Sequence, residues 1–448
     1  LGGEMTGQLS GKPVPLIITA SFLTLLAVTP LPTVPLLTLA LITGGTAFFT
    51  MRQAGRDRQA AAVEAAAEAE SKMAPPAPAV EDLLKVDTLE LEIGFGLVRL
   101  VDQNQGGELL DRITASRRHL AAEIGLVMPP VRIRDNMTLA PNAYRINVRG
   151  NTVAEGEVMP GALLAMDSGI TTGPLNGQPT REPAFGLDAW WIDEAQRGRA
   201  ESLNYTVVDA TSVLITHLSE LVKNHADELL TREEVNNLLE QLKQHSPKLV
   251  EEVVPEIIGP GEVQKVLQAL LREGVPIRDM ETVLEVLGDW ATKTKDTDVL
   301  VEYVRNGLRR TICQKHASAG HPGPDGRPGK PRLVCVTLDP SFEDAISQYI
   351  ERTQAGTALS MPADVAHLVA RSIIESLRPV TDAGHAPVVI ASPQVRAQVR
   401  SVLAPHLPNA VVLGYNEIVS GVEVESMGLV SLPEAANAAD AANAADAA

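Results

Sequence analysis

The chain carries an unusual stretch at residues 182–192, which reads EPAFGLDAWWI. It places Phe185, Trp190 and Trp191 close together in a protein whose aromatic content is only 3%. Pro183 disfavours helix at the residue before it, and the glycine after Phe185 loosens the backbone there. Core packing is the simpler interpretation of the two tryptophans. For Phe185 we expect exposure at a cleft, because of the resemblance described below.

Composition sets limits on the class of protein. A chain of 448 residues predicts several domains, since single cores rarely grow beyond about 250–300 residues. The formal charge of -18 argues against a general nucleic-acid binder, which needs a basic face to neutralise phosphates. The cysteines, Cys313 and Cys335, are too few for a disulfide framework or a self-contained zinc site. A reducing compartment is the simplest fit.

The N-terminal region differs from the rest of the chain. Two apolar segments, at about 13–29 and 34–51, are separated by a pair of helix-breaking prolines. We interpret residues 1–52 as a transmembrane helical hairpin. Three arginines follow the second apolar segment directly: Arg52, Arg56 and Arg58. By the positive-inside rule they place the large C-terminal part in the cytoplasm. Since the chain begins at Leu1, we expect an N-terminal part beyond it.

After the hairpin, residues 53–86 read as a linker rich in Ala, Glu and Pro. A mixed region of helices and strands follows, with a helix expected at 108–124 and strands at 131–133 and 144–148. A further helix is expected at 212–225, capped by Asp209 or Thr211. The sequence therefore predicts an α/β and α+β multidomain protein.

The second half of the chain changes character twice. Residues 230–310 begin with a capping-box pattern and continue with apolar residues at helical spacing, which predicts an all-helical module. Residues 331–432 alternate short β-branched runs with helical stretches, which predicts a small α/β unit. The last residues, 433–448, are a low-complexity tail that we expect to be disordered.

No residue constellation predicts catalysis, a metal site or a cofactor site. The Gly329-Lys330 pair lacks the glycine that a phosphate loop needs five residues earlier, where Pro324 stands. The nine histidines are scattered. His217 and His225 share one expected helix but lie too far apart to bind a common metal, so we interpret them as satisfied or solvated side chains.

A helix-turn-helix at 263–287 is the alternative functional reading, since its two helices and short connection have the right lengths. It would make the protein a membrane-tethered regulator that binds DNA. The second helix, however, presents several acidic residues that repel phosphates: Asp279, Glu281, Glu285 and Asp289. Arg278 alone cannot offset them, because affinity for DNA rests on phosphate neutralisation.

Several short strings, taken in order, resemble one family. They are GELLDRI at 107–113, VRIRDNM at 131–137, PAFGLDA at 183–189, ITHL at 215–218 and VPIRDM at 275–280. With them the chain resembles the C-terminal part of the flagellar type III export-gate proteins of the FHIPEP family. The likeness extends from the two apolar segments to about residue 430.

The resemblance implies four cytoplasmic subdomains. We expect a first subdomain from 87–160 plus 210–229, and an inserted second subdomain at 161–209. The helical module at 230–310 would be the third, and the α/β unit at 331–432 the fourth.

The resemblance also implies a function. Members of the family assemble as a ring, nine-fold in the family, that docks export chaperones with their substrates and helps to order export. A hydrophobic dimple between the first two subdomains binds the chaperones, and the matching positions here are Glu182, Phe185 and Thr216. Glu182 departs from the family's Asp, which keeps the charge and lengthens the side chain. An exposed aromatic beside a carboxylate and a hydroxyl suits capture of an amphipathic helix.

We therefore expect a component of the flagellar export gate in the bacterial inner membrane, and not an enzyme. The expected partners are flagellar chaperones with their substrates, other export-gate membrane proteins, the export ATPase complex and further copies of the chain in a nonamer. No cofactor, metal ion or nucleic acid is expected.

Overall fold

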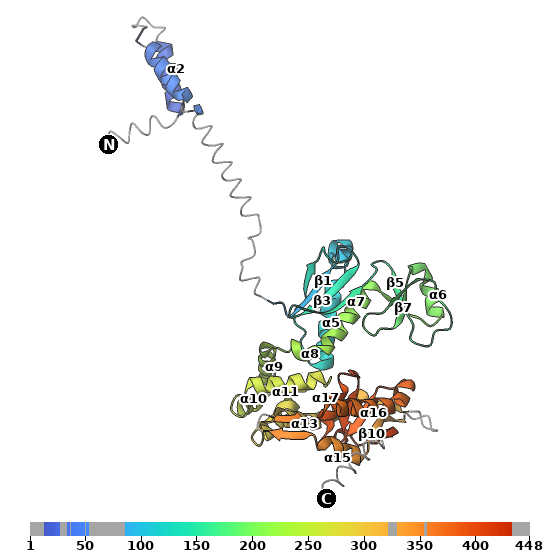
Figure 1. The fold of residues 1–448 in the computed structure, drawn as a ribbon. Coiled ribbons are helices and arrows are strands. Elements are labelled where there is room, and N and C mark those ends of the chain that lie inside the picture. The colour runs from blue at the N-terminus through green and yellow to red at the C-terminus, as the bar shows by residue number, and fades with distance from the viewer. Residues whose placement is uncertain are drawn as a thin grey trace. The chain divides into compact units, whose positions relative to one another are not determined.

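The computed structural model describes residues 13–26, 34–35, 37–49, 51–52, 86–320, 329–353 and 356–431. Contacts divide the chain into two compact units, residues 1–85 and 86–448 (Figure 1). Nearly all of the linker predicted at 53–86, and the tail predicted at 433–448, lie outside the described residues.

The first unit contains α2 (Pro13–Leu26) and further helical residues between 34 and 52. A helix that crosses a bilayer needs about 20 predominantly apolar residues, and α2 has 14 residues in all. Among the residues that the structure describes, no helix has the length and hydropathy to cross a membrane. The spans predicted at 13–29 and 34–51 include residues outside that set, and the transmembrane hairpin is not confirmed.

The second unit begins with a four-stranded sheet of order β2-β1-β3-β4, in which only β1 and β2 are parallel. Leu89, Leu91 and Ile93 alternate along β1 and are all buried, so one face of the sheet is apolar. Helices α5 and α7 contribute to the same core. The elements are β1 (Leu89–Ile93), η2 (Phe95–Leu97), α4 (Val98–Val101), η3 (Gln103–Gln105), α5 (Leu109–Ile124), β2 (Arg132–Asp135), β3 (Ala143–Val148), β4 (Asn151–Glu157) and α7 (Ala210–Asn224).

A second sheet lies between β4 and α7 in the chain, with the antiparallel order β6-β7-β5-β8. Trp191 is buried, and Trp190 packs edge-on against Tyr205 with ring centroids 5.6 Å apart. Both tryptophans therefore pack as the sequence predicted. The elements are β5 (Leu163–Met166), β6 (Gln178–Arg181), β7 (Asp188–Ile192), η4 (Glu194–Gln196), α6 (Arg197–Ser202) and β8 (Thr206–Asp209).

A run of helices follows without an intervening strand up to residue 316. Thr231 caps one of them by accepting a hydrogen bond from the Glu234 amide, 3.2 Å away, and Asp279 caps another through the Thr282 amide. The helices are α8 (Ala226–Leu229), α9 (Arg232–His245), α10 (Pro247–Val253), α11 (Pro260–Arg272), α12 (Met280–Ala291), α13 (Thr297–Gly307) and α14 (Arg309–His316).

The last part is built on a sheet with the parallel order β14-β13-β10-β15, to which β9 adds an antiparallel strand. β11 and β12 form a separate ribbon. The elements are β9 (Ser318–Gly320), β10 (Gly329–Leu338), α15 (Pro340–Ser347), β11 (Ile350–Thr353), β12 (Gly356–Leu359), α16 (Ala363–Asp382), β13 (Val388–Ala391), α17 (Arg396–Leu403), β14 (Val411–Gly414), η5 (Tyr415–Glu417) and β15 (Glu423–Val430). The mixed α/β character predicted from the sequence is confirmed.

Candidate functional site

The 182–187 loop joins β6 to β7 and is organised around a buried carboxylate. The Glu182 side chain is only 2% exposed. Its two oxygens accept hydrogen bonds from the backbone amides of Ala184, at 2.9 Å, and Phe185, at 2.6 Å. The Gly186 amide donates to the Glu182 carbonyl, and the Glu182 amide donates to the Leu187 carbonyl. Gly186 has a φ of 70°, a conformation that favours glycine. The loop is therefore fixed by its own backbone and one carboxylate.

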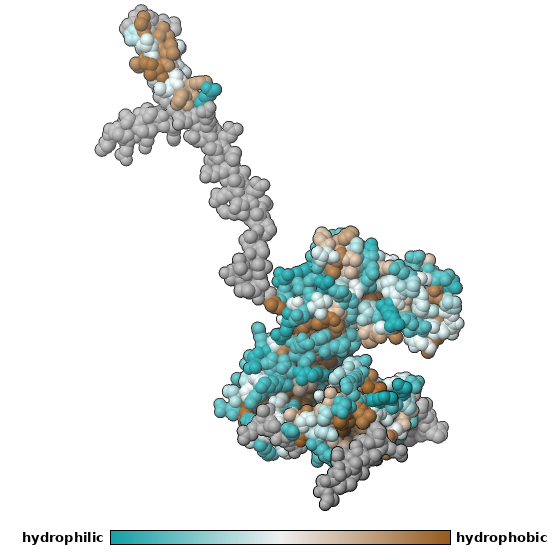
Figure 2. Space-filling model, in the orientation of Figure 1, coloured by the Kyte–Doolittle hydropathy of each residue, from teal (hydrophilic) through white to brown (hydrophobic). Residues whose placement is uncertain are grey.

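Phe185 projects from this fixed loop into solvent, with 61% of its surface exposed. On the face drawn in Figure 2, hydrophilic residues cover most of the second unit and apolar residues gather in a few patches. An exposed aromatic on a rigid turn suits a binding role better than a packing role. Phe185 is exposed as expected, and its position at a cleft stays a prediction.

Thr216 lies on the exposed side of α7, one residue before His217, which is buried. Predicted site residues therefore come from two elements, the 182–187 loop and α7. The loop places Glu182 and Phe185 in direct contact through the Phe185 amide. Thr216 directly precedes His217, on whose pKa the Glu182 carboxylate acts.

A buried polar pair supports the site and was not singled out from the sequence. Tyr144 on β3 and His217 on α7 share a hydrogen bond of 2.7 Å between the Tyr144 hydroxyl and Nδ1 of His217. Burial raises the pKa of Tyr144, and the Glu182 carboxylate raises it further. Burial lowers the pKa of His217 while Glu182 opposes that effect. The Glu182 carboxylate thus lies near enough to act electrostatically on both side chains.

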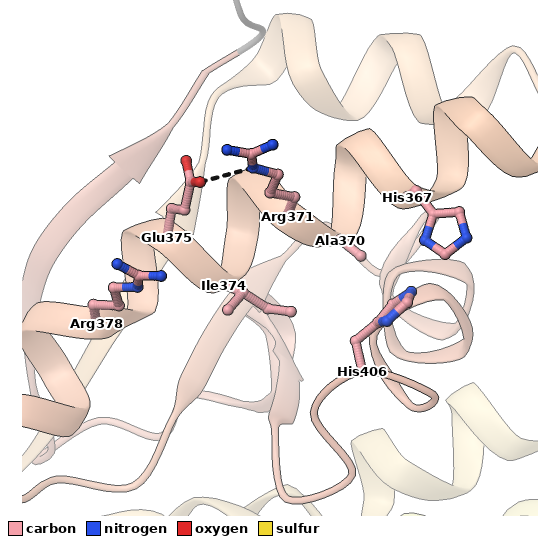
Figure 3. Close-up of a pocket in the computed structure, with 7 residues that line it drawn as sticks. All are labelled: His367, Ala370, Arg371, Ile374, Glu375, Arg378 and His406. Atoms are coloured by element: carbon pink, nitrogen blue, oxygen red, sulfur yellow. Dashed lines mark hydrogen bonds and ion pairs between the residues drawn. The ribbon is translucent and has the colours of Figure 1, made fainter.

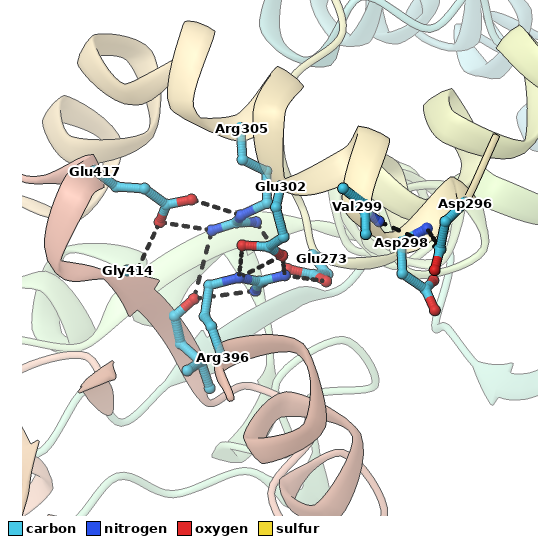
Figure 4. Close-up of polar contacts among 10 residues, drawn as sticks. Glu273, Asp296, Asp298, Val299, Glu302, Arg305, Arg396, Gly414 and Glu417 are labelled. Carbon is cyan, nitrogen blue, oxygen red and sulfur yellow. Dashed lines mark hydrogen bonds and ion pairs between the residues drawn. The ribbon is translucent and has the colours of Figure 1, made fainter. Parts of the chain in front are cut away.

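A second buried charged cluster joins the helices to the C-terminal sheet (Figure 4). We call it the arginine joint, and its members are Glu273, Glu302, Arg305, Arg396 and Glu417. Arg396 donates from Nη1 to Glu273 at 2.6 Å and from Nε to Glu302 at 2.9 Å. Arg305 donates from Nε to Glu417 at 2.6 Å and from Nη1 to Glu273 at 2.7 Å.

Within the joint, opposite charges act on the pKa values of Glu273 and Arg396. Burial favours the neutral form of Glu273, but Arg396 and Arg305 outweigh it and lower the pKa of this carboxyl. Burial likewise opposes charge on Arg396, and Glu273 and Glu302 outweigh it and raise the pKa. Because the members come from the C-cap of α11 and from α13, α17 and η5, the cluster ties two parts of the fold together.

A surface groove of about 370 Å³ lies along α16 and carries two imidazoles (Figure 3). The His367 and His406 rings lie with centroids 4.9 Å apart and their planes tilted by 53°. Arg371, also in the groove, donates from Nε to Glu375 at 2.9 Å, so its charge is largely compensated. Within the described residues, no three His, Cys, Asp or Glu side chains are placed to hold a metal ion.

The helix pair at 263–287 corresponds to α11 and α12, and its apolar residues are buried in the core. The exposed side of α12 carries Glu281, Glu285 and Asp289. Such a face repels phosphates, so the structure gives the DNA-binding alternative no support.

Comparison with known proteins identifies the family. Residues 1–423 match the model of the FHIPEP family. The chain belongs to this family. The flagellar biosynthesis protein FlhA of Bacillus subtilis (strain 168) is 39% identical over 435 residues, which cover 96% of this chain. The protein of the same name from Caulobacter vibrioides is 36% identical over 429 residues, or 95% of this chain. The chain spans 62% and 59% of the lengths of these two relatives.

Solved structures show the same fold. Chlamydia pneumoniae CdsV, from its complex with CdsO, aligns with a TM-score of 0.68 and 26% identity over 78% of this chain and 98% of that chain. The nonameric EscV cytosolic domain of a type III secretion system aligns with a TM-score of 0.58 and 20% identity, covering 78% of this chain and 97% of that chain. At that identity the second likeness concerns the fold alone.

Proposed function

We propose that this chain is a component of the flagellar type III protein export gate that docks chaperone–substrate complexes and helps to order their export. Membership of the FHIPEP family and the flagellar relatives support the proposal. Its role is binding and assembly and not catalysis. The chain spans about 60% of the length of these relatives. The export activity of the complete protein is therefore also a proposal.

The proposed chaperone-binding residues are Glu182, Phe185 and Thr216. The observation that carries this assignment is an exposed phenylalanine on a loop whose backbone is already fixed by Glu182. A preorganised loop loses little conformational entropy on binding, so more of the contact energy appears as affinity. An apolar anchor of this kind fits the apolar face of an amphipathic helix.

We further propose assembly as a ring, with nine copies, and membrane attachment through the predicted hairpin at 1–52. The nonameric state of the EscV domain, which shares the fold, supports the ring. The CdsV–CdsO complex shows that a relative of the same fold binds a further protein. Other gate proteins and the export ATPase complex are the partners proposed here. In this arrangement residues after Arg52 lie in the cytoplasm of a bacterium, beneath the inner membrane.

Binding measurements test the docking proposal. The purified full chain is titrated with a flagellar chaperone–substrate complex, with the chaperone alone and with the substrate alone. We expect micromolar binding of the complex and loss of that binding in Phe185→Ala. Unchanged binding in the variant would place the site elsewhere. No binding to any chaperone complex would contradict the proposed function while leaving the family membership intact.

A further inference from the structure

We propose that Tyr144 and His217 are positioning residues of the docking site: their buried hydrogen bond holds α7, which carries Thr216, in register with the 182–187 loop, which carries Phe185. This inference rests on the proposed function for its biological meaning. Its structural part concerns the molecule alone and can be tested without a chaperone.

The buried Tyr144–His217 pair restricts which residue can stand at a neighbouring strand position. Tyr144 is fully buried and His217 is 6% exposed. In the register of the sheet, Tyr144 on β3 lies opposite Gly156 on β4. A Cβ atom at Gly156 would come within 2.5 Å of both Cζ and the hydroxyl oxygen of Tyr144. A glycine at this strand position therefore leaves the space in which the Tyr144 ring reaches His217.

The hydrogen bond connects two parts of the fold. Tyr144 belongs to the first sheet and His217 to α7, and the two residues are 73 positions apart in the sequence. Their rings meet edge-on, with centroids 5.8 Å apart. Thr216 precedes His217 directly, so a rotation or shift of α7 that moved the imidazole would also move the Thr216 hydroxyl.

The third part is the 182–187 loop. Glu182 is buried, and its charge acts on both members of the pair. A buried carboxylate requires polar surroundings. Two backbone amides of the loop donate to Glu182, and its charge also acts on the Tyr144 hydroxyl and the His217 ring. Removing the hydroxyl would leave Nδ1 of His217 without this partner and change the polar environment of the Glu182 carboxylate. The Ala184 and Phe185 amides should then open more often.

Hydrogen exchange by mass spectrometry on the full chain tests this directly. In Tyr144→Phe we expect exchange of a peptide covering 182–187 to accelerate at least fivefold without any chaperone present. The matched control is Tyr205→Phe, which also removes the hydroxyl of a buried tyrosine, one that donates to the Gly173 carbonyl at 3.0 Å. His217→Gln, whose side chain can still pair with Tyr144, should show a smaller acceleration than His217→Ala.

Equal exchange of the 182–187 peptide in Tyr144→Phe and Tyr205→Phe would overturn the inference, because a general loss of stability would affect both variants alike. Binding of a chaperone–substrate complex is measured on the same samples. Weaker binding in Tyr144→Phe alone supports both proposals. Faster exchange with unchanged binding supports the positioning role and contradicts docking at this loop.

Discussion

The arginine joint and the 182–187 loop both bury carboxylates, but they satisfy them differently. In the joint, Glu273 and Glu417 meet guanidinium groups supplied by Arg305 and Arg396, from elements distant in the chain. In the loop, Glu182 meets backbone amides two and three residues away. The first arrangement fixes parts of the fold relative to one another. The second fixes only a short turn and leaves Phe185 free to meet a partner. Stability and binding should therefore respond to different substitutions.

The largest expected effect on stability is at the joint. Arg396→Met leaves Glu302 without its guanidinium partner and Glu273 with Arg305 alone. Breaking a buried ion pair in this way costs about 3–5 kcal/mol of unfolding free energy. Denaturant unfolding followed by circular dichroism measures it. As a control, Arg371→Met breaks an exposed pair with Glu375 and should leave the unfolding midpoint unchanged. Similar midpoints for both variants would contradict a structural role for the joint.

Lowering the pH should reduce the unfolding free energy, because a histidine beside the arginine joint, His316, becomes protonated. His316 lines a small cavity with Glu273 and Arg305. Burial and the neighbouring charges of Lys315 and Arg305 lower the pKa of His316 to about 4. The unfolded chain binds this proton at higher pH, so stability is lost as pH falls from about 6.5 towards 4, by about 3 kcal/mol at most.

The measurement is the unfolding free energy of the wild type and His316→Gln between pH 7 and 4. The variant should show a shallower decline, with a residual slope because the pKa of buried His217 is lowered too. His367→Gln, on the exposed face of α16, serves as the control. A decline that is equally steep in all three proteins would show that His316 does not titrate with folding.

Glu182→Ala should have a smaller effect on folding and a clear one on binding. It removes the acceptor of two amides, and a group left unsatisfied in this way costs about 1–3 kcal/mol. Some of this free energy is recovered if the amides reach water. We therefore expect the unfolding free energy, measured in denaturant, to fall by about 2 kcal/mol. Glu182→Gln, which keeps one acceptor oxygen, should fall between the wild type and Glu182→Ala. Chaperone binding should weaken in the same order, and reversal of that order would argue against loop preorganisation.

Local features of this fold were predictable from sequence. The capping-box pattern at Thr231 predicted α9, and the apolar stripe of Val263 to Leu271 predicted α11. Caps and helical spacing are local signals that the sequence carries directly. Asp209, one of two candidate caps, accepts from the Ser212 amide at 2.9 Å. β15 was not named as a strand from the sequence, and most of its side chains are exposed, with no alternation of burial along the strand.

The candidate site was predictable only in part. The turn residues around Phe185 left its exposure open, and the resemblance supplied Glu182, Phe185 and Thr216. The Tyr144–His217 pair could not be found, since its members are 73 residues apart and no spacing rule connects them. The same holds for Arg396 and Glu273, which are 123 residues apart. Long-range polar pairing depends on the tertiary fold, and local periodicity carries no information about it.

The contrast between folding and docking is tested most directly at two matched phenylalanines. Phe185 is 61% exposed and Phe95, on η2, is 62% exposed. Unfolding free energy and affinity for a chaperone–substrate complex are measured for Phe185→Ala and Phe95→Ala. Both should unfold within about 0.5 kcal/mol of the wild type. Only Phe185→Ala should lose affinity, by about 2 kcal/mol or roughly thirtyfold. Equal affinities of the two variants would contradict docking at the 182–187 loop.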